Sequence, residues 1–257
     1  MKLIKILIAF VALASLQIAA AQWLNVPPPA VARNLMVVGG GVAGGASWSC
    51  TDANVLCDSF DTTAGDGFDD ATWTTGTAGT STVNPNYAHT GAFYCDENSA
   101  ESLKLVNDGT NTCYACNDFG ASKNAVYGVF YFKIDWLIAD QTYFLVLADS
   151  SCIDWNLDTR IIYESASQFE LYFIAYGQSA VTTTKNYQVD VWHKVEFQWI
   201  KNQATNGVRI WVDGTEEYTS TAPDYAIRYI NFRLTASTNA FQVDNIKVSD
   251  TSMPSCE

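Results

Sequence analysis

The sequence predicts an all-β fold in which two antiparallel sheets pack face to face, as a sandwich or jelly roll. From Trp48 onward, short segments rich in aromatic and β-branched residues follow one another along the chain. Their connections contain Gly, Asn, Asp, Ser or Pro, which are the residues that turns select. Inside several segments apolar and polar residues alternate, so one face would be buried and the other exposed. Regular spacing of this kind is typical of antiparallel sandwiches.

The clearest strands are expected, in chain order, at residues 125–138, 141–149, 160–165, 168–177, 192–201, 207–214, 229–237 and 241–250. No part of the chain alternates strands with helices of ten or more residues, so nothing would cover a parallel sheet. We expect Trp192 to plug the core at the start of its strand, and His193 to be structural or exposed. The alternation places these residues in the core: Phe130, Phe132, Ile134, Phe169, Leu171, Phe173, Val195, Phe197, Trp199, Ile230, Phe232 and Leu234.

Residues 1–21 have the features of a secretory signal peptide. Two lysines precede an apolar run from Ile6 to Ile18, and Ala19 and Ala21 supply the small side chains of a cleavage site. The run is shorter than the roughly 17 to 25 residues that cross a bilayer. We therefore expect a secreted, soluble protein whose mature chain begins at Gln22, without membrane insertion.

Residues 22–47 are rich in Pro and Gly and are interpreted as a linker or arm. Gly39, Gly41 and Gly44 match the dinucleotide-binding pattern G-x-G-x-x-G, which works only where a helix opens at the last glycine. The residues that follow are dense in Asp, Thr, Ser and Gly and show no helical periodicity. This excludes a dinucleotide site and assigns residues 48–257 to the folded domain.

The mature chain is strongly acidic. The full chain of 257 residues carries a formal charge of −13, and removing 21 residues with two lysines leaves 236 residues and a charge of −15. Such a charge repels phosphate backbones, so nucleic acid is a poor partner. Calcium or neutral glycans suit it better, although acidity also serves simply to keep a secreted protein soluble.

Every cysteine lies in the exported part of the chain, where oxidation is expected. We predict up to three disulfides and one remaining thiol among seven cysteines. Cys113 and Cys116 have redox-motif spacing, but no βαβ pattern surrounds them, and we expect a structural staple in a turn-rich loop. Zinc is disfavoured because the chain has only His89 and His193 to complete a site. The cysteines are Cys50, Cys57, Cys95, Cys113, Cys116, Cys152 and Cys256.

Several expected strands carry aromatic and polar side chains on the row opposite the core. Aromatic rings stack on the C–H faces of sugars, while amide, carboxylate and guanidinium groups bond sugar hydroxyls. An ordinary solvated sheet has a similar composition, so that alternative stays open. The predicted ligand-binding residues are Tyr131, Glu170, Tyr172, Glu196, Gln198 and Arg233.

Residues 190–218, with a W-H-x-V strand and a V-D-G turn, resemble the concanavalin A-like, laminin G-like jelly-roll superfamily. Residues 241–250 resemble its closing strand, and residues 58–73 and 87–105 resemble its opening strands. The resemblance covers Cys57 to Asp250 and implies the jelly-roll fold. It leaves function open, because the superfamily contains lectins, adhesion modules, glycanases and polysaccharide lyases.

The resemblance also implies a structural calcium ion between the opening and closing strands. The matching ligand is Asp244, with Asp58 or Asp61 as partner, although Asp244 could equally bond a nearby turn. Because the first and last strands of this topology are neighbours, Cys50 or Cys57 is expected to pair with Cys256.

No catalytic residue is predicted. The paired carboxylates of retaining glycanases of this fold, E-x-D-x-x-E, do not occur in the chain, and neither does the R-x-E-x-R strand of its lyases. The sequence therefore predicts a secreted module that binds an oligosaccharide, a polysaccharide or a glycosylated surface without chemistry. Two alternatives remain: a polysaccharide-degrading enzyme, as hydrolase or lyase, and a structural subunit of a surface appendage.

Overall fold

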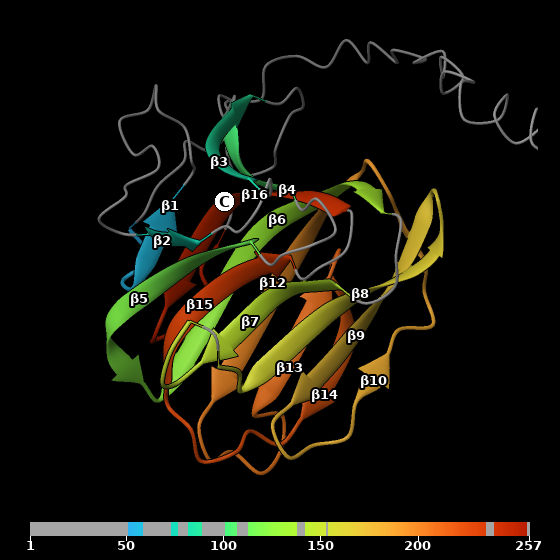
Figure 1. Cartoon of the computed structure of the whole chain (residues 1–257). Coiled ribbons are helices and arrows are strands. Elements are labelled where there is room, and N and C mark those ends of the chain that lie inside the picture. Colours follow the sequence, from blue (N-terminus) through green and yellow to red (C-terminus); the bar gives the residue numbers. More distant parts are fainter. Residues whose placement is uncertain are drawn as a thin grey trace, which may run out of the picture. The chain divides into compact units, whose positions relative to one another are not determined.

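Two antiparallel β-sheets make up the fold, which we describe from a computed structural model (Figure 1). The structure describes residues 51–58, 73–76, 82–88, 101–106, 113–137, 142–152, 154–234 and 239–255. Within these ranges there is no helix, and so none that could span a membrane. The predicted signal peptide and the arm lie outside the described residues.

Sheet A contains β1 (Leu56–Asp58), β3 (Thr82–Ala88), β4 (Glu101–Val106), β6 (Ala125–Leu137), β12 (Trp192–Ile200), β13 (Val208–Val212), β14 (Thr215–Ser220) and β16 (Asn239–Ser249). Its strands follow the order β14-β13-β12-β6-β16-β4-β3, with β1 also paired to β16.

Sheet B contains β2 (Trp73–Gly76), β5 (Cys113–Lys123), β7 (Thr142–Ala148), β8 (Leu157–Ser165), β9 (Gln168–Ala175), β10 (Val181–Thr182), β11 (Tyr187–Gln188) and β15 (Ile227–Leu234). Its strands follow the order β10-β9-β8-β7-β15-β5-β2, with β11 also paired to β9. The chain repeatedly crosses between the two sheets, and the predicted jelly-roll sandwich is confirmed.

The expected strands match the observed ones closely, but β5 and the two-residue strands β10 and β11 were not expected. Residues 113–123 form the long strand β5, whereas the sequence suggested a turn-rich loop around Cys113 and Cys116. This stretch pairs with β15 on one side and with β2 on the other. Pairing with these two strands makes it extended, although its composition is typical of a loop. The strands β10 and β11 were not foreseen, because each has only two residues and so shows no alternation.

The core lies between the two sheets, and every core residue predicted from alternation is at most 1% exposed. Phe132 of β6 lies among aromatic rings from both layers. Its ring centroid is 4.9 Å from that of Phe144 and 6.0 Å from that of Phe169, both on sheet B, and 5.6 Å from that of His193. These contacts join the layers through edge-to-face and stacked aromatic pairs.

Gly128 of β6 explains how the large ring of Phe197 fits between the sheets. The two residues are directly paired across β6 and β12. A Cβ at position 128 would lie 2.2 Å from the Cζ atom of Phe197, closer than any van der Waals contact. A glycine is therefore required here, because the ring occupies the space of the missing side chain.

The turn between β13 and β14 confirms the predicted V-D-G hairpin and also fixes His193. Asp213 and Gly214 have positive φ angles of 51° and 76°, as the two central residues of a type I′ turn require. Nδ1 of His193 lies 2.9 Å from Oδ2 of Asp213, and Nε2 lies 3.0 Å from the carbonyl oxygen of Gln188. Both ring nitrogens are engaged by partners from the turn and from β11. His193 is thus structural.

Trp192 is not the core plug that its size suggested. It pairs with Lys133 on the outer side of sheet A, and the Lys133 ammonium lies 5.6 Å from its ring. Its neighbour His193 points inward instead and is 5% exposed. Side chains alternate along β12, and His193 shares the inward face with Val195, Phe197 and Trp199. Trp192, one position earlier, therefore faces outward.

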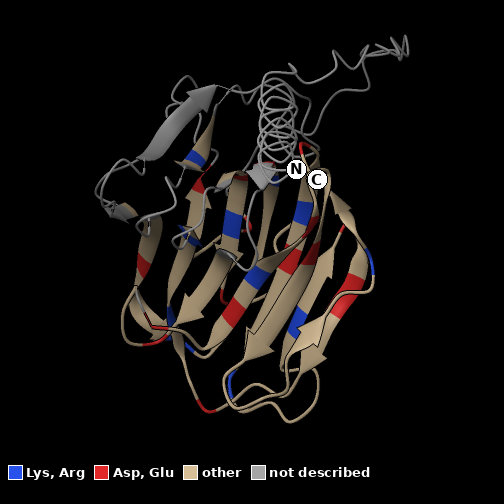
Figure 2. Cartoon of the chain, turned by 45° about the vertical axis from the view of Figure 1, so that its right-hand side comes forward, with Lys and Arg blue, Asp and Glu red and all other residues tan. Residues whose placement is uncertain are grey.

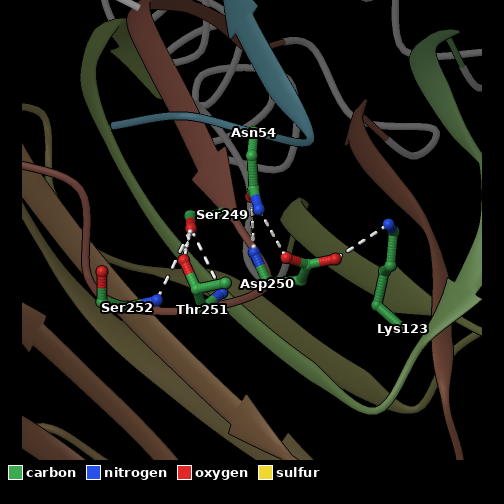
Figure 3. Close-up of polar contacts among 6 residues, drawn as sticks. All are labelled: Asn54, Lys123, Ser249, Asp250, Thr251 and Ser252. Atoms are coloured by element: carbon green, nitrogen blue, oxygen red, sulfur yellow. Dashed lines mark hydrogen bonds and ion pairs between the residues drawn. The ribbon is translucent and has the colours of Figure 1, made fainter. Parts of the chain in front are cut away.

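The two ends of the described domain are tied together by Asp250, directly after β16 (Figure 3). Its backbone N–H donates to the Asn54 side chain at 3.0 Å, and its carboxylate accepts from Asn54 at 2.6 Å and from Lys123 at 2.9 Å. These bonds join the entry to β1, the end of β16 and the end of β5. The hydrogen bond and ion pair from Lys123 hold the pKa of Asp250 below its usual value.

Cys116 and Cys152 form a disulfide that links β5 to the loop after β7. This confirms a structural role for Cys116, although its partner is not the nearby Cys113. Cys57 is also disulfide-bonded. The predicted pairing of Cys50 or Cys57 with Cys256 lies outside the described residues, as do Cys50, Cys95 and Cys256 themselves.

Candidate functional site

The six predicted ligand-binding residues do not form one surface. Tyr131, Glu196 and Gln198 lie on the outer face of sheet A, whereas the others lie on the outer face of sheet B. Alternation predicts which side chains face outward, but it cannot say which sheet a strand joins. Figure 2 shows basic and acidic residues interspersed along the strands. The two groups belong to opposite faces of the sandwich. Those on sheet B are Glu170, Tyr172 and Arg233.

The candidate site is a polar cluster on the outer face of sheet B, centred on Asp158. Asp158 of β8 pairs with Val146 of β7, which pairs in turn with Asn231 of β15. Directly paired residues share a face, so these three side chains form a row across neighbouring strands. All three are fully buried. We call Asp158, Arg160, Tyr172, Asn156, Asn231 and Arg233 the Asp158 cluster.

Arg160 joins the carboxylate of Asp158 to the ring of Tyr172. Its Nε and Nη2 atoms donate to Oδ2 of Asp158 at 3.0 and 2.8 Å. Its guanidinium carbon lies 5.2 Å from the centroid of the Tyr172 ring, which faces it directly across β8 and β9. The cation–π contact and the two hydrogen bonds to Asp158 together fix the position of the guanidinium.

Burial changes the acidity of Asp158. The loss of water around this carboxyl raises its pKa above the ordinary value, and the nearby Arg160 and Arg233 only partly oppose that rise. A carboxyl with raised pKa in a polar cluster is typical of binding and catalytic sites.

Three buried side-chain oxygens of the Asp158 cluster have no hydrogen-bond partner: Oδ1 of Asp158, Oδ1 of Asn231 and Oδ1 of Asn156. Native proteins leave few buried polar atoms in this condition, because each costs about 1–3 kcal/mol. Oxygens that accept hydrogen bonds need donors, and sugar hydroxyls are donors. These three oxygens therefore need donors that the described residues do not supply.

The loop from Asp149 to Asn156 forms one wall of this cluster. The Cys116–Cys152 disulfide anchors the loop to β5, and the Asn231 amide donates a hydrogen bond to the carbonyl of Cys152. Trp155 in this loop contacts Tyr176, at the end of β9, with 5.6 Å between ring centroids. Tyr176 is 47% exposed, so the wall presents an accessible aromatic ring beside the cluster.

The other predicted ligand residues line a groove on the outer face of sheet A. One cavity of about 910 Å³ is lined by Tyr131, Glu196 and Met253 among others, and a second of about 280 Å³ by Glu196, Gln198 and Met253 among others. The central polar groups here already have partners. Lys194 pairs with Glu196 at 3.0 Å, and Gln198 donates to the Asn206 carbonyl at 2.8 Å.

The predicted calcium ligands are not brought to one face. Asp58 pairs with the core residue Ile246 and accepts a 2.8 Å hydrogen bond from the Trp73 indole. Asp244 pairs with Tyr131, on the outer side of sheet A. A β-bulge separates Asp244 from Lys247 on β16, and Asp61 lies outside the described residues, so a calcium ion at Asp244 stays a prediction. Within the described ranges, no three His, Cys, Asp or Glu side chains form a group that could hold a metal ion.

Sequence reasoning missed Asp158, Arg160 and Asn231. The sequence does contain one indication of this site. Asp158 and Arg160 are two residues apart, so on a strand their charged side chains lie on the same face. The start of β8 was expected at Arg160, three residues later than it is. Pairing across three strands, far apart in sequence, then brings Asn231 to the same row.

The two packed antiparallel sheets define a jelly-roll β-sandwich. No protein-family model matches the chain, and no curated protein matches it. Among solved structures it is similar to "Cellulose induced protein, Cip1", with a TM-score of 0.54 and 14% identity over 78% of this chain and 100% of that chain.

Two further solved structures resemble the chain more distantly. The alginate lyase AlgAT5 of polysaccharide lyase family 7 has a TM-score of 0.45 and 14% identity, over 63% of this chain and 84% of that one. The T. cruzi calreticulin globular domain has a TM-score of 0.48 and 12% identity, over 72% of this chain and 86% of that one. At these identities the likeness is one of fold.

Proposed function

We propose that the protein is a secreted carbohydrate-binding module whose ligand lies on the outer face of sheet B, against the Asp158 cluster. The observation that carries the proposal is the set of three buried, unpartnered acceptor oxygens on Asp158, Asn231 and Asn156. Sugar hydroxyls would donate to these oxygens, and the guanidinium of Arg160 would donate to sugar oxygens in return. The exposed ring of Tyr176 adds a stacking surface at one end.

Other features support a polysaccharide or a glycosylated surface as the partner. Cip1, whose name describes a protein induced by cellulose, has the same fold. The Cys116–Cys152 disulfide suits an oxidising compartment, as secretion would provide. Adhesion to a glycosylated surface would use the same chemistry as binding to a free polysaccharide.

The test is a screen of immobilised oligosaccharides against the whole protein, with Tyr172→Ala and Arg160→Lys as variants. Tyr172→Ala should weaken the strongest interaction about tenfold, because the ring that orients Arg160 is lost. Arg160→Lys should weaken it similarly, since lysine cannot donate the same fork of hydrogen bonds. Tyr172→Phe should bind nearly normally, as it keeps the aromatic face.

The matched control is Arg228→Lys. Arg228 also makes a forked pair with a carboxylate, Asp118, and also lies over a tyrosine ring, Tyr229, at 5.3 Å. It is outside the Asp158 cluster, so its replacement should leave binding unchanged. Equal binding by wild type, Tyr172→Ala and Arg160→Lys would show that the ligand lies elsewhere. Release of reducing ends or unsaturated sugars during the screen would establish an enzyme instead.

A structural calcium ion at Asp244 remains a separate proposal, and the structure adds the neighbouring Asn245 as a further ligand. Both residues are fully buried, and Oδ1 of Asn245 has no hydrogen-bond partner. Calcium prefers carboxylate, amide and carbonyl oxygens of this kind. When bound, the ion would supply positive charge next to the buried carboxylate.

Thermal unfolding with and without a chelator tests the calcium proposal. Calcium at about a hundredfold its Kd should stabilise the wild-type protein by about 2.7 kcal/mol, and the melting temperature should rise accordingly. Magnesium at the same concentration should have a smaller effect, because it demands stricter geometry. An Asp244→Asn variant that still responds fully to calcium would rule out this residue as a ligand.

A further inference from the structure

We infer that the groove on the outer face of sheet A is a second glycan-binding site, specific for neutral sugar chains and independent of the Asp158 cluster. The two cavities of about 910 and 280 Å³ share Glu196 and Met253, so they lie next to each other along β12 and together make a groove. We call this the β12 groove. A groove of this size accommodates several sugar rings.

Aromatic side chains are spread along the length of the β12 groove. Trp192 and Tyr131 line its larger cavity, and Tyr127 and Trp211 line its smaller one. Strand register separates them: Trp192 pairs with Lys133, whereas Trp211 pairs with Glu196, four residues further along β12. That offset corresponds to about 13 Å of extended strand, so successive sugar units could meet different rings.

The polar side chains between these rings suit sugar hydroxyls. Nζ of Lys194 and Oε1 of Glu196 are 3.0 Å apart and sit side by side on β12. An ammonium group has three donors and a carboxylate has several acceptor positions, so the pair can donate to one hydroxyl and accept from its neighbour. Both side chains are partly exposed, at 31% and 25%, and so accessible to a ligand.

The charge balance of the β12 groove selects neutral chains over acidic ones. The lysine lining it is already paired, because Nζ of Lys194 lies 3.0 Å from Oε1 of Glu196. The His193 ring, which also lines it, contacts Asp213 at 2.9 Å. No lining cation among the described residues is left to attract a carboxylated or sulfated sugar. The net charge of the chain, −13, adds a general repulsion of polyanions.

The C-terminal segment builds the far wall of the β12 groove. Met253, Pro254 and Ser255 line the larger cavity. The carbonyl of Ser255 accepts a 2.8 Å hydrogen bond from Lys247, and its N–H donates to Asp52 at 2.6 Å. The wall is therefore tied to β16 and to the chain entering β1.

Calorimetric and fluorescence titrations test the inference, with cellohexaose, xylohexaose, mannohexaose and chitohexaose as probes. At least one should bind the wild-type protein, and Trp211→Ala should weaken that interaction about tenfold through loss of stacking. Trp211→Phe should retain most of the affinity, because it keeps a ring at this position. Tyr172→Ala, on the opposite sheet, should leave the Trp211-dependent component unchanged.

The outcomes separate this inference from the proposed function. Loss of binding in Trp211→Ala but not in Tyr172→Ala supports the β12 groove, even if the Asp158 cluster binds nothing. Loss in Tyr172→Ala alone supports the Asp158 cluster and overturns the inference. The inference also fails if none of the four neutral probes binds, or if Trp211→Ala binds all of them as tightly as the wild type does. An alginate hexasaccharide that binds through Trp211 would overturn its selectivity for neutral chains.

Discussion

A Phe132→Ala variant is expected to lose about 3–5 kcal/mol of unfolding free energy. Phe132 is fully buried, and its ring contacts Phe144 and Phe169 of sheet B as well as His193 of its own sheet. Truncation would therefore leave a cavity between the two layers that neither sheet can close without moving. Urea denaturation followed by tryptophan fluorescence measures the loss as a lower midpoint.

The matched control is Phe132→Leu, which keeps most of the buried apolar volume. It should cost about 1.5 kcal/mol or less, because the loss is one of shape and aromatic contact. Both variants should retain the wild-type denaturant slope. If Phe132→Ala and Phe132→Leu unfold at the same urea midpoint, the neighbouring side chains close the space left by the ring. The prediction of a persistent cavity between the two sheets would then be wrong.

Replacing both Cys116 and Cys152 with alanine is expected to cost about 3–4 kcal/mol. The disulfide joins residues 36 positions apart and so restricts a long loop of the unfolded chain. It also holds the Asp149–Asn156 loop against the Asp158 cluster. The double variant should therefore melt at a lower temperature than the wild type and, under the proposed function, give weaker binding in the oligosaccharide screen.

A Val181→Ala variant provides the control for this loss, since Val181 is 40% exposed on a two-residue edge strand. Its melting temperature should match that of the wild type. If the double cysteine variant loses less than about 1 kcal/mol, the disulfide contributes little to stability. If it loses stability but keeps full glycan affinity, the loop does not shape the site.

Strand positions and their inward faces could be predicted because they depend on local pattern alone. Val195, Phe197 and Trp199 alternate with polar residues, and the structure buries each of them. The Asp213–Gly214 turn is local in the same sense, because its residue types fix the backbone angles. The strand Cys113–Lys123 was missed because pairing with β15 and β2 outweighs its loop-like composition.

The candidate site could be predicted only in part, because it depends on contacts between distant segments. The sequence identifies Tyr172 and Arg233 as outward-facing, yet it also groups them with Tyr131, which belongs to the other sheet. The row from Asp158 through Val146 to Asn231 exists only once three strands have paired. Burial of Asp158 and the rise in its pKa follow from that pairing, and no single segment indicates them.

Strand order has a consequence for how this chain acquires its structure. The last two strands occupy interior positions, with β15 inserted between β7 and β5 and β16 inserted between β6 and β4. A nascent polypeptide that ends before Ile227 therefore holds two split half-sheets, each with unsatisfied backbone hydrogen-bonding groups along the gap. Folding must wait for these late segments, and such non-local closure is slow. During that delay the open edges depend on chaperones or on rapid completion of synthesis to escape aggregation.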